Sequence, residues 1–174
     1  MNPNKISLRP LQESDRNDLI LYANNKNIFD NLRDLMPFPY HKKDFESFYK
    51  LIQDEEPVKN FAIAYNHQFC GMIGLHLQQD VYRKTAEIGY WIGEPFWNKG
   101  IGTGAVGLIV RYGLDSFDIN RIHAGVFEYN KASMRVLEKN GFELEGIARK
   151  AIFKNGKVWN EHRFALVADK EMMR

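Results

Sequence analysis

The segment from Asn98 to Gly104 holds the residue types whose spacing points most directly to chemistry. It reads Asn-Lys-Gly-Ile-Gly-Thr-Gly and runs into apolar residues at helical spacing. Glycines ahead of a helix let the backbone approach a ligand, so that several N–H groups and the helix dipole point at one anion. Lys99 adds a positive charge at the same place. The pattern predicts a phosphate-binding loop, with a flexible turn as the alternative.

Three phosphate-binding motifs compete for this segment. A Walker loop is excluded because no Gly-Lys-Ser or Gly-Lys-Thr occurs. Gly102 to Gly107 does match GxGxxG, and Glu128 lies about 20 residues beyond it, as in dinucleotide-binding proteins. However, residues 93–101 separate this match from the preceding strand, and the upstream strands form hairpins where a dinucleotide-binding unit would alternate strand and helix. A nicotinamide-dependent oxidoreductase stays as an alternative.

The elements that must position the loop follow from hydrophobic periodicity. Three strand-like runs directly before it leave no room for helices between them and predict an antiparallel meander. After the loop, helix and strand patterns alternate, and an Asn-Gly pair near the end predicts a hairpin turn. In chain order we expect a strand over 6–11, helices over 14–23 and 42–54, strands over 61–65, 70–79 and 85–92, a helix over 105–116, a strand over 121–127, a helix over 130–140, and strands over 143–153 and 159–168.

Length and composition indicate one globular domain. The chain has 174 residues, of which 44% are hydrophobic, and it carries 24 basic and 22 acidic side chains for a formal charge of +2. We expect a single domain over residues 1–174. So small a net charge gives no general attraction to nucleic acid or to anionic lipid, and neither is expected as a partner.

Cys70 is the only cysteine, so no internal disulfide can form and no zinc-ligand spacing occurs. We expect no metal site and a reduced, cytoplasmic setting. The N-terminus has no apolar signal segment, and no apolar run approaches the ~20 residues that a membrane helix needs. These features predict a soluble protein.

The run from Trp97 to Ala105 resembles the acyl-CoA pyrophosphate loop of the GNAT family of N-acetyltransferases, whose usual form is Gln/Arg-x-x-Gly-x-Gly/Ala. Trp97 departs from that form by replacing Gln or Arg. Similarity to the RimJ/RimL branch extends to Glu-Ile-Gly-Tyr-Trp-Ile at 87–92, Asn-Lys-Ala-Ser at 130–133 and Leu-Glu-Lys-Asn-Gly-Phe at 137–142. The resemblance covers residues 6–168 in element order.

This resemblance implies an α/β fold with a central, mostly antiparallel seven-stranded sheet flanked by helices, in which a splayed strand pair binds coenzyme A (CoA). It also implies transfer of an acetyl group from acetyl-CoA to a primary amine, by direct attack of the amine on the thioester. An N–H near Ile92 would then face the thioester oxygen. The residues implied to bind acetyl-CoA are Trp91, Ile92, Gly93, Trp97, Asn98, Lys99, Gly100, Ile101, Gly102, Thr103, Gly104, Asn130 and Ser133.

Glu87 is the residue that we expect to act as general base, directly or through water. Strand alternation places it on one face with Gly89 and Trp91, near the splayed pair. A salt-bridged or solvated glutamate is the alternative, and His76 and His123 on central strands are other candidates for the base.

Ser133 is the group that the branch resemblance points to as proton donor to the leaving thiolate. Many relatives place a tyrosine seven residues after the asparagine, and this chain has Leu137 there. Ser133 lies on the same helical stripe, although it could equally satisfy only the helix backbone. Asn130 is expected to cap that helix with its side-chain oxygen and to leave its amide nitrogen for CoA. The missing tyrosine leaves a non-catalytic CoA-binding or nucleotide-binding module as the alternative function.

The segment Asn24 to Tyr40 is expected to form one wall of the acceptor groove, with aromatic side chains such as Phe38 and Tyr40 able to line it. A protein N-terminus and a small-molecule amine both stay open as the acceptor. A monomer and a homodimer both stay open as the assembly. Cys70 is expected to be a small buried strand residue, because direct transfer needs no acyl-enzyme.

Overall fold

The computed structural model describes residues 6–168. They fall into two compact units, each built from separate stretches of chain. The first unit combines the chain up to Gly74 with Tyr90–Leu108, and the second combines Leu75–Gly89 with the chain from Ile109 onward. The expectation of a single domain stays a prediction.

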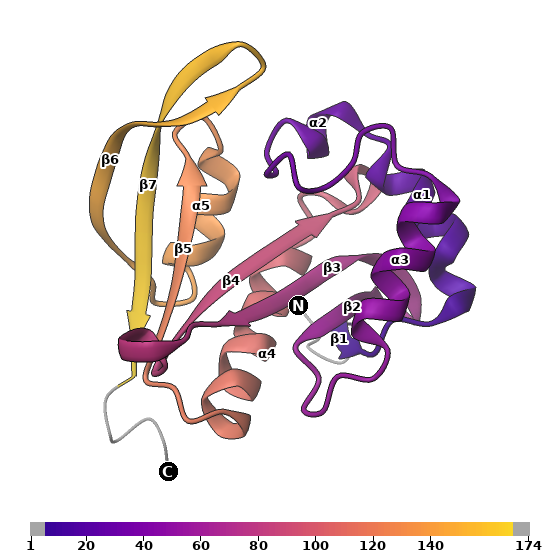
Figure 1. The fold of residues 1–174 in the computed structure, drawn as a ribbon, viewed down its shortest axis with the longest axis horizontal. Coiled ribbons are helices and arrows are strands. Elements are labelled where there is room, and N and C mark those ends of the chain that lie inside the picture. Colours follow the sequence, from indigo (N-terminus) through magenta and orange to yellow (C-terminus); the bar gives the residue numbers. More distant parts are fainter. Residues whose placement is uncertain (1–5, 169–174) are drawn as a thin grey trace. The chain divides into compact units, whose positions relative to one another are not determined.

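Seven strands form one sheet in the order β1-β2-β3-β4-β5-β7-β6 (Figure 1). Among the pairings given for the described residues, β4 with β5 is the parallel one, and helix α4 (Ile101–Ser116) supplies the crossover that a parallel pair needs. This confirms the expected mixed, mostly antiparallel sheet. The strands are β1 (Ile6–Arg9), β2 (Asn60–Tyr65), β3 (Gln68–Leu77), β4 (Thr85–Ile92), β5 (Arg121–Phe127), β6 (Glu143–Lys154) and β7 (Lys157–Val167).

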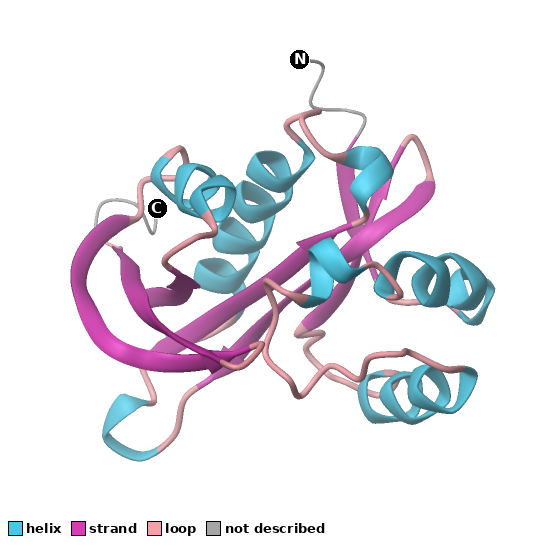
Figure 2. Ribbon diagram, turned by 90° about the horizontal axis from the view of Figure 1, so that it is seen from above, coloured by secondary structure: helices cyan, strands magenta, loops and turns pink. Residues whose placement is uncertain are grey.

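The other helices are α1 (Arg16–Ala23), α2 (Lys26–Phe29), α3 (Lys42–Ile52) and α5 (Lys131–Glu138), with short 3-10 turns η2 (Glu13–Asp15), η3 (Asp80–Tyr82) and η4 (Glu94–Phe96). In the first unit, α1 and α3 contact each other (Figure 1 and Figure 2). Their apolar faces bury Leu19 and Phe45 in one core with Phe69 of β3. The amphipathic spacing read from the sequence therefore builds the core that supports β3.

Both hairpin turns have the backbone that their sequences favour. Asn66 and His67 connect β2 to β3 with φ of 50° and 68°, and Asn155 and Gly156 connect β6 to β7 with φ of 52° and 74°. Two successive left-handed residues fit a type I′ turn, whose twist matches that of the flanking strands. The β6–β7 hairpin forms a long twisted ribbon (Figure 1), and its register shifts twice, between Leu144 and Gly146 and again between residues 148 and 152.

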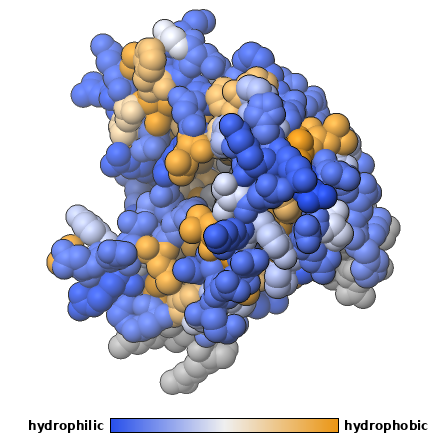
Figure 3. All heavy atoms as spheres, turned by 45° about the vertical axis from the view of Figure 1, so that its right-hand side comes forward, coloured by the Kyte–Doolittle hydropathy of each residue, from blue (hydrophilic) through white to orange (hydrophobic). Residues whose placement is uncertain are grey.

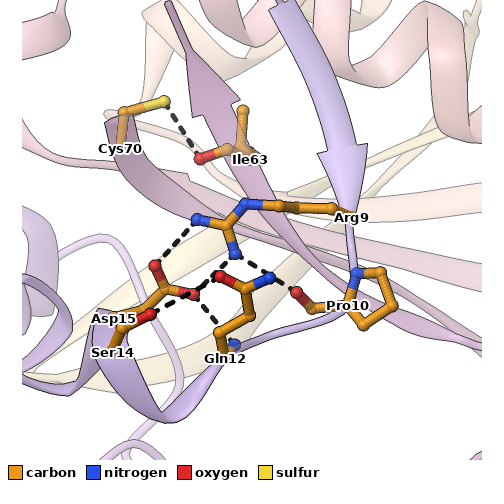
Figure 4. Close-up of polar contacts among 7 residues, drawn as sticks. All are labelled: Arg9, Pro10, Gln12, Ser14, Asp15, Ile63 and Cys70. Carbon is orange, nitrogen blue, oxygen red and sulfur yellow. Dashed lines mark hydrogen bonds and ion pairs between the residues drawn. The ribbon is translucent and has the colours of Figure 1, made fainter. Parts of the chain in front are cut away.

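Arg9 and Asp15 anchor the start of the first helix to strand β1 (Figure 4). The two guanidinium nitrogens of Arg9 donate to the two carboxylate oxygens of Asp15, each at 2.7 Å. Asp15 also accepts from the Gln12 N–H at 2.9 Å, and its side chain is only 7% exposed. The hydrogen bond to Asp15 is the main cause that raises the pKa of Arg9. The pair therefore satisfies a carboxylate that would otherwise be buried as an unpaired charge.

Replacing Arg9 with alanine is expected to lower the free energy of unfolding by about 3 kcal/mol, because the Asp15 carboxylate stays buried without its cation. Urea unfolding measures the change. Arg16→Ala is the matched control, since Arg16 pairs with the exposed Glu13 and should cost less than about 1 kcal/mol. Equal losses in the two variants would contradict a special role for Arg9.

Several large hydrophobic side chains remain exposed, among them Leu35 at 91% and Leu51 at 76%. On the face drawn in Figure 3, hydrophobic residues occur in small groups among hydrophilic ones. Over residues 6–168, no helix is both long and apolar enough to cross a membrane. The same part of the chain contains no group of three His, Cys, Asp or Glu side chains that could hold a metal ion. The cytoplasmic setting stays a prediction.

Candidate active site

The end of β4 is held against β3 by a close backbone contact in the first unit. Gly93 N–H donates to Cys70 O at 2.8 Å. At Gly71 a Cβ would lie 2.2 Å from Trp91 O, so a glycine is required for the approach of these strands. Because backbone groups alternate between the two edges of a strand, the N–H of Ile92 points away from β3. The family resemblance implies that an N–H near Ile92 faces the thioester oxygen, and this stays a prediction.

The chain then turns through η4 into the predicted phosphate loop, and two side chains tie this turn together. The Trp97 indole N–H donates to Ile92 O at 2.7 Å. Lys99 Nζ donates to Pro95 O at 2.9 Å and lies 5.4 Å from the centroid of the Phe96 ring. Trp97 is 38% exposed, and its indole connects the loop to β4.

Left-handed backbone at Asn98 (φ 59°) and Gly100 (φ 73°) brings the chain to the start of α4. The helix begins at Ile101, earlier than expected, so Gly102, Thr103 and the following glycine form its first turn. First-turn N–H groups have no acceptor within their own helix and point out of its N-terminus. The predicted glycine-rich loop is thus a short turn followed by a helix N-terminus, a geometry that suits an anion.

Gly104 has a role that differs from the one predicted. Its N–H donates to Gly100 O at 3.1 Å, as part of the helix ladder. A Cβ at Gly104 would lie 2.6 Å from Cδ1 of Ile6 in β1. This glycine therefore serves the packing of α4 on β1, and the N–H groups that can meet a ligand belong to the residues before it.

Glu87 lies in the second unit, where β4 pairs with β5. The parallel register matches Thr85, Ala86 and Glu87 with Arg121, Ile122 and His123, and it ends there although both strands continue. Two strands that splay apart must stop pairing before their ends, as β4 and β5 do here. Glu87 and His123 are half-buried neighbours, whereas His76 on β3 is exposed. Burial alternates along this part of β4, because Ala86 and Ile88 are buried whereas Glu87 and Gly89 are more exposed.

Asn130 and Ser133 sit at the start of α5 as expected. The side-chain oxygen of Asn130 accepts from the Ser133 N–H at 3.1 Å, which is the predicted N-cap. Asn130 and Ser133 are half-buried, but Leu137 is fully buried and packs in the core. The position where many relatives carry a tyrosine is therefore a core position in this chain. Ser133, which lies on the same face of α5, is half-buried and carries a hydroxyl.

Three other predicted residues can now be placed. Burial raises the pKa of the Cys70 thiol to about 12, and the thiol donates to Ile63 O at 3.3 Å (Figure 4), so this cysteine stays protonated within the strand. Tyr40 is 5% exposed and belongs to the core of the first unit, where burial raises its pKa to about 12. Phe38 is 43% exposed and stacks on Phe29 with centroids 4.7 Å apart. Of the two aromatic residues considered for the acceptor groove, Phe38 is exposed and Tyr40 is buried.

A pocket of about 420 Å³ lies in the first unit between α1, the start of α2 and η4. Glu94 is its acidic residue, and the carboxylate accepts from the side-chain amides of Asn25 and Asn27, the latter at 3.1 Å. The lining residues are Leu21, Tyr22, Asn25, Glu94 and Pro95.

Glu128 was considered from the sequence only as part of a dinucleotide-binding pattern, and the structure gives it another role. Its carboxylate binds Asn160, which lies 32 residues further along the chain. No local motif indicates this pair, because the register of β5 with β7 brings the two residues together.

Residues 5–143 match the model of the family described as acetyltransferase (GNAT) domain. The chain belongs to the GNAT acetyltransferase family. A Bacillus subtilis protein named "Probable N-acetyltransferase YjcK" is 36% identical over 165 residues, which cover 91% of each chain. This relative and the family match confirm the predicted family and the enzyme class, N-acetyltransferase.

Two solved structures share the GNAT fold. The microcin self-immunity acetyltransferase MccE, in complex with acetyl-CoA and AMP, is 30% identical with a TM-score of 0.79, over 94% of this chain and 93% of that one. RimL, a ribosomal alpha-N-protein acetyltransferase in complex with coenzyme A, is 22% identical with a TM-score of 0.83, over 95% of each chain. The predicted fold is thereby confirmed over nearly the whole chain.

Proposed function

We propose that this GNAT enzyme transfers an acetyl group from acetyl-CoA to a primary amine by direct attack of the amine on the thioester. The observation that carries the proposal is the turn into α4, where left-handed Asn98 and Gly100 lead to the N-terminus of a 16-residue helix. Backbone N–H groups at such a terminus bind phosphate oxygens. The complex of MccE with acetyl-CoA supports the same ligand here.

The residues that would hold acetyl-CoA form two groups. Lys99 and the N–H groups from Gly100 to Thr103 would bind the diphosphate, because they combine positive charge with donors at one helix end. The backbone of Trp91, Ile92 and Gly93 would bind the pantetheine arm, and Asn130 would contribute its amide nitrogen. Bound acetyl-CoA supplies the activated acetyl group.

Three groups would act on the reacting atoms. Glu87 would take a proton from the amine, directly or through water, because only the neutral amine is nucleophilic. The Ile92 N–H would donate to the thioester oxygen, where negative charge develops. The Ser133 hydroxyl would donate a hydrogen bond to the sulfur as the C–S bond breaks and the thiolate leaves, and the thiolate would then take its proton from water.

The acceptor is a primary amine on a protein N-terminus or on a small molecule. The 420 Å³ pocket supports the expected contribution of the segment Asn24 to Tyr40, since Asn25 lines it together with Glu94. Release of the CoA thiol in the presence of peptides, polyamines and aminoglycosides tests the proposal, and mass spectrometry of the product identifies the acceptor. The homodimer stays a prediction that sedimentation velocity tests.

One observation favours a second function. Leu137 is fully buried where many relatives carry a tyrosine. If no other group assists the leaving thiolate, the chain would bind CoA without turnover. Such a binding module would show a calorimetric Kd for acetyl-CoA but no release of thiol that depends on an amine.

Gly102→Val is expected to raise the Kd for acetyl-CoA at least tenfold, because a branched side chain in the first turn of α4 keeps the phosphates from the N–H groups. Hydrogen bonds to charged groups contribute about 1.5–3 kcal/mol, which corresponds to roughly 10–150-fold in Kd. Isothermal calorimetry measures the effect. Gly146→Val is the control, because a Cβ at Gly146 meets no atom within 4 Å. A folded Gly102→Val protein with an unchanged Kd would show that the loop is not the phosphate site.

A further inference from the structure

Glu128 and Asn160 form a three-bond clamp in the second unit, just beyond the last regular pair of β5 and β7. Phe127 and Glu161 are that last pair. The Glu128 N–H donates to Asn160 O at 3.1 Å. In return, one carboxylate oxygen of Glu128 accepts from the Asn160 N–H at 2.8 Å, and the other accepts from the Asn160 side-chain amide at 2.9 Å. Both carboxylate oxygens and the backbone N–H of Glu128 are therefore bonded to one partner residue.

The orientation of the Asn160 amide is fixed from its other side. Its side-chain oxygen accepts from the Lys150 N–H at 2.9 Å. Lys150 has a left-handed φ of 55° and lies in the irregular stretch of β6 between residues 148 and 152. Because this oxygen must face Lys150, the amide NH2 must face Glu128. A carboxylate, which only accepts hydrogen bonds, is the matching group at position 128.

The clamp lies directly before the segment that carries the proposed sulfur-facing serine. Tyr129 follows Glu128, and its ring packs edge-on against Trp159 with centroids 4.9 Å apart. The Asn130 N–H donates to Phe127 O at 2.8 Å, and the Asn130 side chain caps α5 through the Ser133 N–H. Four residues thus separate Glu128 from Ser133, and tertiary or capping contacts hold the stretch at both ends.

We infer that Glu128 is a positioning residue, which acts through Asn160 to hold the β5–α5 connection so that Asn130 and Ser133 keep their working geometry. The inference rests on the proposed function of those two residues. A catalytic group must stay within about 0.5 Å of its productive position, and a misplacement of 1 Å can cost about 10²-fold in rate. Glu128 itself makes no contact with reacting atoms in this role.

A swapped pair of substitutions tests the clamp. Glu128→Gln sets an amide NH2 against the NH2 of Asn160, and Asn160→Asp sets two carboxylates against each other. The double variant Glu128→Gln, Asn160→Asp exchanges donor and acceptor and keeps both the number of hydrogen bonds and the total charge. Each single variant is expected to lower kcat by about 10–100-fold, and the double variant is expected to recover to within about threefold of the wild type.

Glu145→Gln is the matched control, because it is the same substitution in the same unit. Glu145 pairs with Arg121 at the opposite end of β5, and its hydrogen bond to Arg121 lowers the pKa of the exposed Glu145 carboxyl. This variant should leave kcat within about twofold, since exposed ion pairs contribute little.

Hydrogen–deuterium exchange of the peptide that covers residues 128–140 separates this inference from the proposed function, because it needs no acceptor amine. Exchange is expected to quicken at least tenfold in each single variant and to return in the double variant. Unchanged exchange in Glu128→Gln, or faster exchange in an enzyme that keeps its kcat, would overturn the inference.

The same substitutions in a Ser133→Ala background show whether the clamp acts through the serine. Glu128→Gln should then lower kcat less than threefold further, whereas independent effects would multiply. Multiplied losses would overturn the positioning of Ser133. A wild-type kcat in Ser133→Ala itself would instead reject the proposed role of the serine and leave the exchange result intact.

Discussion

Ser133→Ala is expected to lower kcat by about 10²–10⁴-fold, the range for positioned acid–base groups, and to change the KM for acetyl-CoA far less. The serine is the hydroxyl at the start of α5 that is not buried, and its N–H is held by the side-chain oxygen of Asn130. Removing its hydroxyl leaves the helix cap intact but removes the donor to the leaving sulfur. Steady-state kinetics with a saturating acceptor measure the change.

Ser133→Thr keeps a hydroxyl and should retain most of the rate. Ser116→Ala, at the exposed end of α4, is the control for loss of a serine hydroxyl. A tyrosine at position 137 is no usable rescue, because Leu137 is fully buried and a larger side chain would overpack the core. If Ser133→Ala turns over like the wild type, the thiolate leaves without help and the serine has only a role in the helix.

Glu87→Gln is expected to lower kcat by about 10²–10⁴-fold at neutral pH, with little change in the KM for acetyl-CoA. An alkyl amine has a pKa of about 10 and is mostly protonated at pH 7. Without the base, little of the amine is deprotonated and the rate falls. Raising the pH deprotonates the amine without help. The deficit of the variant should therefore shrink as the pH approaches the pKa of the amine.

His123→Gln distinguishes the two neighbouring candidates for the base, because His123 lies opposite Glu87 in the parallel register. If Glu87 is the base, His123→Gln should show no loss of kcat that recovers at high pH. Suppose instead that kcat falls strongly in His123→Gln, recovers at high pH, and is nearly unchanged in Glu87→Gln. The histidine would then be the base.

Much of the fold follows from local patterns in the sequence. Period-2 alternation located β4 and β5, and Asn155-Gly156 marked the β6–β7 turn, because only a few residue types tolerate left-handed φ in such turns. The beginning of α4 was predicted four residues too late. Glycine has a low intrinsic helix propensity, so residues 101–104 read as loop, whereas the structure uses them as the first helical turn.

Local motifs could be read from the chain, whereas contacts set by the register of the sheet could not. The cap at Asn130 is local, and the structure shows it as predicted. The segment from Trp97 to Gly104 is also continuous in the chain, and its part in binding acetyl-CoA stays a prediction. The roles of Glu128 and Gly104 depend on Asn160 and Ile6, which come from distant strands. Tyr40 was considered for the groove but is buried, because its neighbours in the core come from α1, α3 and the sheet.

Release of the CoA thiol from acetyl-CoA, followed against amine concentration and paired with mass spectrometry of the products, is the most direct test of N-acetyl transfer. The account predicts one thiol for each N-acetylated amine, a rate that saturates with at least one class of amine, and no acetylated enzyme when the amine is left out. Acetyl-CoA that binds with a measurable Kd, together with thiol release at the enzyme-free rate for peptide, polyamine and aminoglycoside acceptors alike, would contradict it.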